Sequence, residues 1–202
     1  MTLSANLRRC MGMLLFALIA GCGAHSSAVS YYSLDAMAAG PQVSTADLKG
    51  PAIGIAEVML PDYLDRPQLV WRTGENRMNV DEYHRWAGQL QDEISRVLLE
   101  NLRTLGPSPR IERAPWPTGF RPDIIVTLQL NNFEAFPDGM VRLTGSVTLA
   151  DLRPSAQPIV WNVRLQEAAA RRSPSAYVAA QSRLLATLSR QIGDAIGRRP
   201  QP

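Results

Sequence analysis

Cysteine and histidine are scarce in this 202-residue chain, which has two of each. Cys10 lies in an N-terminal segment that we expect to be removed, so Cys22 is the single cysteine of the mature chain. One cysteine cannot form an internal disulfide, and it excludes a structural zinc site built from cysteines. The two histidines, His25 and His84, leave few candidates for catalytic or metal-binding roles.

The chain also lacks the short motifs that carry common enzyme chemistry. It has no Gly-x-Ser-x-Gly, no His-Glu-x-x-His and no glycine-rich phosphate-binding loop. Asp62 and Asp65 lie close enough to suggest paired acids or a metal, but without further ligands we interpret them as hydrogen-bonding residues of a loop. His84, next to Arg85, is interpreted as a surface or core-edge residue. The sequence therefore predicts a protein with no catalytic residues, no metal and no cofactor apart from a covalent lipid.

Lysine is nearly absent, since Lys49 is the only one. The whole chain has 21 Lys and Arg residues against 18 Asp and Glu residues, a net charge of +3. The expected signal peptide holds Arg8, Arg9 and no acidic residue, so the mature chain has 19 basic residues (21 minus 2) against 18 acidic ones, a net charge of +1. This balance gives no support for nucleic-acid binding.

Residues 1–21 have the three-part pattern of a bacterial lipoprotein signal peptide. Arg8 and Arg9 form a positive start, and residues 11–20 form an apolar run that is too short to span a bilayer. Small residues then precede Cys22, where they give a signal peptidase access to the bond. The Cys22 sulfur is the expected site of diacylglycerol attachment. An ordinary signal peptide and a buried apolar helix with an incidental cysteine are the alternatives.

The mature chain has 181 residues (202 minus 21), enough for one domain with a real core. Residues 22–30 are expected to form an acylated tether, whose last eight residues span at most about 28 Å. Residues 31–197 form the domain, and residues 198–202 are a short tail. Several acyl chains, at about 0.8 kcal/mol per buried methylene, make a lasting anchor.

Apolar residues recur at intervals of three and four over residues 81–105, which predicts a helix about 35 Å long. Asp81 or Asn79 is the expected N-terminal cap, and Gly106 followed by Pro107 is the expected stop.

A second helix is predicted from Pro174 to Gly197, with Ser173 as its cap. Alternating apolar and polar residues, with a turn at residues 136–139, predict an antiparallel meander in the second half of the chain. Candidate strands cover residues 31–34, 52–60, 68–72, 77–80, 110–112, 124–130, 141–149 and 159–165. The predicted fold is α/β of the α+β type, a single small domain with a mostly antiparallel sheet and two long amphipathic helices packed on one face.

Pro61 and Pro67 bound the segment Asp62-Tyr63-Leu64-Asp65-Arg66, which stiffens it and disfavours a helix. One interpretation is a tight loop whose Tyr63 and Leu64 plug the edge of the core. The other is a partner-binding surface, because loops on rigid scaffolds often carry function. The sequence leaves both open.

The segment Leu60–Val70, the following Arg72 and the run Tyr83-His84-Arg85-Trp86-Ala87 together resemble the PqiC/YmbA family of ABC-type transport auxiliary lipoproteins. The resemblance extends to Phe133-Glu134 in the predicted meander. Family members continue Arg-Trp-Ala with Glu-Pro-Leu, whereas this chain has Gly88-Gln89-Leu90. Any role of that Glu-Pro pair is therefore not carried over, and the predicted helix runs on without a proline.

The resemblance implies an accessory lipoprotein on the periplasmic face of the outer membrane, in a Pqi-type system that moves lipid between membranes and maintains envelope integrity. Its implied partner is a periplasm-spanning MCE-domain protein, and we also expect a homo-oligomer. Gly23, in place of an aspartate after Cys22, agrees with the outer membrane as destination. The residues expected to bind the partner are Asp62, Tyr63, Leu64, Arg66 and Arg85.

Two other functions stay open at this point. A lipoprotein adaptor that regulates another periplasmic machine, such as a peptidoglycan synthase, differs in the identity of its partner. A lipid carrier needs an enclosed apolar cavity, of which the alternating strands give no sign. Trp86 lies on the predicted buried stripe, so Arg85 beside it is the better probe of recognition.

Overall fold

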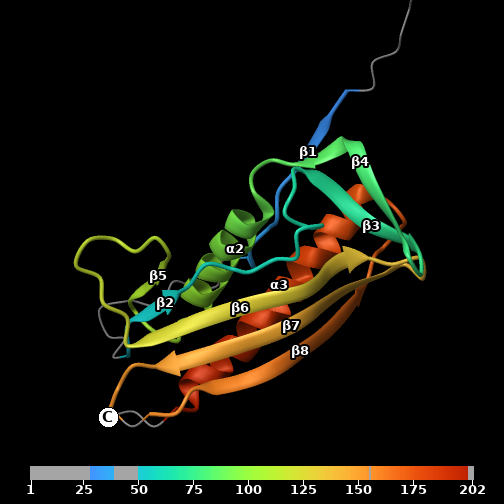
Figure 1. The fold of residues 1–202 in the computed structure, drawn as a ribbon. Helices are drawn as coiled ribbons and strands as arrows, with labels where there is room; N and C mark the ends of the chain where they lie inside the picture. The colour runs from blue at the N-terminus through green and yellow to red at the C-terminus, as the bar shows by residue number, and fades with distance from the viewer. Residues whose placement is uncertain (1–27, 39–49, 155, 200–202) are drawn as a thin grey trace, which may run out of the picture.

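The computed structural model describes residues 28–38, 50–154 and 156–199, so the expected signal peptide, Cys22 and the end of the tail lie outside the described part. Within it, both helices cover one face of a single curled sheet (Figure 1). The elements are β1 (Ser30–Tyr32), β2 (Ile53–Ile55), β3 (Gln68–Gly74), β4 (Arg77–Trp86), α2 (Leu90–Leu105), β5 (Ile111–Arg113), β6 (Ile124–Ala135), β7 (Met140–Asp151), β8 (Ile159–Ala168) and α3 (Pro174–Gly197). The predicted α+β class, a single small domain, is confirmed.

An antiparallel meander of β6, β7 and β8 forms the larger part of the sheet. Along β7, buried apolar side chains alternate with half-buried ones, as expected for a strand packed against a core. The predicted turn precedes β7: the Phe136 N–H donates to the Met140 carbonyl over 2.8 Å, and Gly139 has a φ of 85°. On its other side β6 pairs in parallel with β2 and, at its end, with β3, from which β4 and β1 continue the sheet.

Gly145 lies on β7 opposite a bulge in β6, where the register shifts between Leu130 and Asn132. A Cβ atom at position 145 would collide with the main-chain carbonyl oxygen of Gln129. Glycine therefore allows the two strands to approach each other closely at the bulge.

The two helices pack against each other and close one side of the core. α3 begins as predicted, because the Ser173 hydroxyl accepts the Ala176 N–H and Pro174 occupies the first turn. α2 ends as predicted at Gly106, which has a φ of 67° and donates its N–H to the Leu102 carbonyl. Sequence capping signals thus locate the start of α3 and the end of α2, and α3 also ends at the predicted residue, Gly197, with Arg198 as its C-cap.

The start predicted for the first helix is wrong. Residues 77–86 form strand β4, and α2 begins at Leu90, so it has 16 residues and a length of about 24 Å instead of about 35 Å. Asp81 does not cap a helix, because its carboxylate accepts the N–H groups of Tyr83 and His84 inside an irregular part of β4. Pairing with β3 on one side and β1 on the other outweighs the helical periodicity.

The expectation that the helix runs through Gly88 and Gln89 is wrong for the same reason. Gln89 is the N-cap of α2, with an extended backbone and no side-chain capping bond. The helix therefore begins directly after the position that holds proline in the family pattern, although this chain has no proline there.

Candidate functional site

The segment between Pro61 and Pro67 is a compact turn fastened to the sheet. Leu64 is 3% exposed, and its N–H donates to the Pro61 carbonyl over 2.9 Å. The Tyr63 hydroxyl donates to the main-chain carbonyl of Asn131 over 2.9 Å. Tyr63 and Leu64 therefore plug the edge of the core, which is the first of the two interpretations that the sequence left open.

A buried carboxylate, Glu134 of β6, holds this turn in place. It accepts hydrogen bonds from Arg72 Nε over 2.9 Å, from the Phe133 N–H over 2.7 Å and from the Asn132 amide over 3.0 Å, and the Tyr63 hydroxyl lies 3.2 Å away. A buried carboxylate needs such compensation, because burial removes the water that would otherwise solvate its charge. Burial raises the pKa of Tyr63 and the charge of Glu134 raises it further, so the phenol remains protonated.

The Arg85-Trp86 pair lies against the end of the same turn. The Trp86 N–H donates to the Pro67 carbonyl over 2.8 Å, and Arg85 is the register partner of Gln68. The Arg85 guanidinium forms an ion pair with Glu82 over 2.9 Å. Trp86 is 4% exposed and belongs to the core, as predicted, although it lies on a strand and not on a helix.

The five residues expected to bind a partner therefore separate into two groups. Asp62 is exposed, and Arg66 and Arg85 are partly exposed, so these charged side chains reach solvent. The Nε of Arg66 has no hydrogen-bond partner in the part of the chain that the structure describes. Tyr63 and Leu64 instead pack inward and set the shape of the surface from below.

His84 and Asp81 form a local pair, with 2.9 Å between Nδ1 and the carboxylate. The His84 ring also lies 5.7 Å from the ring of Tyr32. Among the described residues, no group of three or more His, Cys, Asp or Glu side chains could hold a metal ion. Asp62 and Asp65 are both exposed in the turn.

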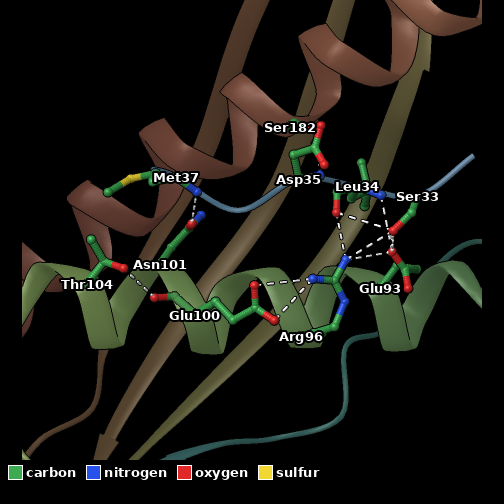
Figure 2. A network of polar contacts seen from close by, with 10 residues as sticks. All are labelled: Ser33, Leu34, Asp35, Met37, Glu93, Arg96, Glu100, Asn101, Thr104 and Ser182. Carbon is green, nitrogen blue, oxygen red and sulfur yellow. Dashed lines mark hydrogen bonds and ion pairs between the residues drawn. The ribbon is translucent and has the colours of Figure 1, made fainter. Parts of the chain in front are cut away.

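The segment that leads from the expected anchor into the domain is clamped between α2 and α3 (Figure 2). Leu34 is 1% exposed, its N–H donates to Glu93 over 3.1 Å, and its carbonyl accepts from Arg96 over 2.6 Å. The Asp35 N–H donates to the Ser182 hydroxyl of α3 over 3.0 Å. Main-chain groups of the segment are thus fixed by side chains of both helices.

Glu93 is the centre of this clamp. Burial alone would raise its pKa, but hydrogen bonds from Arg96, the Ser33 hydroxyl and the Leu34 N–H together lower it below its ordinary value. The carboxylate is therefore charged at neutral pH and holds segment and helix together. Further along, the Met37 N–H donates to the Asn101 side chain over 2.7 Å.

A groove of about 730 Å³ lies between β8 and the C-terminal part of α3, open to solvent. The sequence predicts that the odd-numbered apolar residues of β8 are buried. Val163 is 4% exposed, but Ile159 is 42% exposed, and Trp161 and Leu165 are only partly covered. α3 therefore leaves part of this apolar face uncovered, which the alternation along the strand could not reveal.

Sequence reasoning also missed the clamp. Asn101, Ser182 and Ser189 are polar residues on the buried sides of the two helices, and Asn101 donates to Ser189 over 3.1 Å. Polar residues on the apolar side of a predicted helix could have indicated the clamp, because a buried polar side chain requires a hydrogen-bond partner.

A family model described as the ABC-type transport auxiliary lipoprotein component matches residues 32–193, most of the chain. The protein belongs to this family of transport auxiliary lipoproteins. Membership makes it an auxiliary of ABC-type transport and associates it with a membrane. Neither described helix is long and apolar enough to cross a membrane.

Two curated relatives of this auxiliary lipoprotein are both named intermembrane transport lipoprotein PqiC, one from Escherichia coli K12 and one from Shigella flexneri. Each is 28% identical over 127 residues, which is 63% of this chain and 66% of the relative. The match therefore spans just under two thirds of the length of these relatives.

Two solved structures share the fold of this family member. A crystal structure of an uncharacterized protein aligns with a TM-score of 0.68 and 22% identity over 84% of this chain and 99% of its own. Protein XCC0632 from Xanthomonas campestris aligns with a TM-score of 0.62 and 15% identity over 83% of this chain and 95% of its own. At these identities the likeness concerns the fold alone.

Proposed function

We propose that this protein is the outer-membrane lipoprotein of a Pqi-type intermembrane lipid transport system. Acylated Cys22 holds the domain on the periplasmic face of the outer membrane, where it docks a periplasm-spanning MCE-domain protein as a homo-oligomer and supports envelope integrity. The observation that carries the proposal is the family match over residues 32–193, and the two PqiC relatives support the intermembrane process.

The clamp gives the anchor a mechanical role in this function. The six steps of main chain from Cys22 to Ala28 span at most about 21 Å, so the domain stays close to the bilayer surface. Leu34 and Asp35 are bonded to side chains of α2 and α3. A force on the lipid anchor is therefore transmitted to the packed helices, so that the anchor also orients the domain.

The corner of the domain next to the anchor suits a bilayer surface. Tyr31 is 66% exposed, Tyr83 is 52% exposed and Val29 is 40% exposed, and they come from β1, its flank and the paired strand β4. Tyrosine is favourable at membrane interfaces, because its ring is apolar while its hydroxyl remains in contact with water. In the proposed orientation Tyr31 and Val29 lie on the membrane, and Arg85, the register partner of Tyr31, lies at the border between this corner and the partner-binding surface.

The proposed docking surface consists of the charged side chains Asp62, Arg66 and Arg85. Glu134, Arg72 and Tyr63 fix the turn beneath them, so little conformational entropy is lost when a partner binds. The charges set orientation and specificity more than affinity.

Replacement of the acylation site tests the function. Cys22→Ser removes the sulfur that receives the lipid, so we expect the protein in the soluble periplasmic fraction and no rescue of detergent resistance in a strain that lacks the gene. Cys10→Ser, within the expected signal peptide, is the matched control and should behave as wild type. Full rescue by a soluble Cys22→Ser protein would count against the proposal.

A further inference from the structure

Strand β8 is an edge of the sheet, and among the described residues it pairs with β7 alone. The Phe136 N–H donates to the Met140 carbonyl, and in an antiparallel pair every second residue of a strand bonds to the same neighbour. The N–H and C=O groups of even-numbered residues in β7 therefore point to β6, and those of odd-numbered residues point to β8. The Ala169 N–H donates to the Gly139 carbonyl, so odd-numbered residues of the β7–β8 pair bond to each other from its start. The register of this pair has no shift, so the same pattern continues along β8. Main-chain groups that point outward from β8 therefore belong to Val160, Asn162, Arg164 and Gln166.

Within the described ranges, these outward groups have no hydrogen-bond partner. The end of the edge is closed, because Arg183 of α3 donates to the Ala168 carbonyl over 3.2 Å and to the Glu167 carboxylate over 2.7 Å. α3 thus satisfies the edge where it lies close to the strand. Where the groove separates them, a row of unpaired N–H and C=O groups remains, and such a row is a template for another strand.

The groove beside this edge has side chains that suit an extended peptide. Ile159, Trp161 and Val163 line it at two-residue spacing, which matches the side-chain repeat of a strand. Arg164 and Arg198 have no ion-pair partner in the described part of the chain, whereas Arg199 is paired with Asp151 over 3.0 Å. Asp194 is the single carboxylate in the lining, so the surroundings favour an acidic occupant.

We propose that β8 binds an extended segment of a partner polypeptide, which adds to the sheet as a further strand. An acyl chain could fill the apolar part of the groove, but only a second peptide main chain satisfies N–H and C=O groups at two-residue spacing. Apolar side chains at alternate positions of the segment enter the groove, and an acidic side chain pairs with Arg164 or Arg198. The inference rests on the proposed function, since the segment belongs to the protein that this lipoprotein docks.

Two substitutions at position 162 separate main-chain pairing from side-chain contact. Asn162→Pro removes an outward N–H, and an edge strand tolerates proline there because that N–H makes no bond to β7. Asn162→Ala removes the same side chain and keeps the N–H. Val160→Pro and Val160→Ala form a second pair nearer the end of the strand, and thermal unfolding verifies that each proline variant folds.

The measurement is photo-crosslinking from benzoylphenylalanine at position 166 of the acylated full-length protein in intact cells, with sequencing of the captured peptide. We expect a segment of another protein with alternating apolar residues and an acidic residue. Its yield should be unchanged in the alanine variants, about tenfold lower in the folded proline variants and lower with Arg198→Glu. Equal yields in the alanine and proline variants, capture of a second copy of this chain, or no capture would overturn the inference.

A second photo-crosslinking residue, at position 62, distinguishes failure of the β8 inference from failure of the proposed function. Capture of a partner from position 62 but not from position 166 overturns the β8 inference and leaves the proposed function standing. Capture from neither position contradicts both.

Discussion

Glu134 is a fully buried charge that belongs to the core of this protein. Its cation is Arg72, 22% exposed, which also lies 5.3 Å from the ring of Phe136. Arg72→Met keeps an aliphatic side chain but leaves the carboxylate without its cation. We expect the free energy of unfolding to fall by about 3 kcal/mol in urea denaturation.

The matched control for this substitution is Arg77→Met. Arg77 is exposed and its guanidinium donates to the Thr73 hydroxyl, so the change should be within about 0.5 kcal/mol. A loss of under about 1 kcal/mol for Arg72→Met would mean that the pair does not hold the turn in place.

Asp151 makes the stability depend on pH. Hydrogen bonds from Arg153, with the added charge of Arg199, lower the pKa of Asp151 from 3.8 to about 2. Because the folded pKa is below the unfolded one, this contribution is fully present above about pH 4 and is lost as the pH falls to about 2. Urea denaturation at several pH values should show a smaller decrease between pH 4 and pH 2 for Asp151→Asn than for the wild type. The same decrease in the free energy of unfolding for both proteins would contradict the role assigned to Asp151.

At the scale of the elements, the clamp joins the N-terminal segment to α2 and α3 (Figure 2). Glu93→Ala removes the acceptor of the Leu34 N–H, so we expect amide exchange at Leu34 to accelerate about tenfold while exchange in β6 is unchanged. Glu112→Ala, which breaks a surface ion pair with Arg103, is the control and should leave Leu34 unaffected. Unchanged exchange at Leu34 in both variants would mean that the segment is held by packing alone.

The elements that could be predicted from the sequence are those with one regular pattern and local end signals. The meander follows from period-two alternation, and α3 follows from its stripe and Ser173. The start of α2 could not be predicted, because residues 81–87 have helical spacing. The strand forms there because β4 pairs with β3 and with β1, and β1 is more than fifty residues away in sequence. The Pro61–Pro67 turn and Arg85 belong to one motif of the family that the sequence resembles. The pairing of β3 with β4 places Arg85 beside the end of that turn.

The clamp and the β8 groove depend on where α2, α3 and β8 lie relative to one another. No pattern within a single element contains that information. Polar residues such as Asn101 on a buried helix side indicate that a partner exists but not which one. The incomplete burial of Ile159 follows only from the course of α3.

At the scale of the whole molecule, the proposed anchor at Cys22 predicts an orientation of the domain relative to the membrane. In the acylated protein the Cys22 thiol is blocked, so Tyr31→Cys introduces the only free thiol of the mature chain. A fluorophore there should be quenched by nitroxide lipids in vesicles, because this corner lies on the membrane in the proposed orientation.

Leu152→Cys is the control for this labelling. Leu152 is 56% exposed and follows β7, which ends on the side of the molecule away from β1 (Figure 1). Its label should not be quenched. Equal quenching at both positions would contradict the orientation.

The central claim is that the domain docks an MCE-domain protein at the outer membrane through the surface above the fastened turn. Asp62 is its most direct probe, because it is exposed and makes no contribution to the core. A photo-crosslinking residue at position 62 in the membrane-bound protein should capture an MCE-domain protein, and less of it when Arg85 is changed to Glu. Capture of a peptidoglycan synthase, or of no protein but a second copy of this chain, would contradict the account.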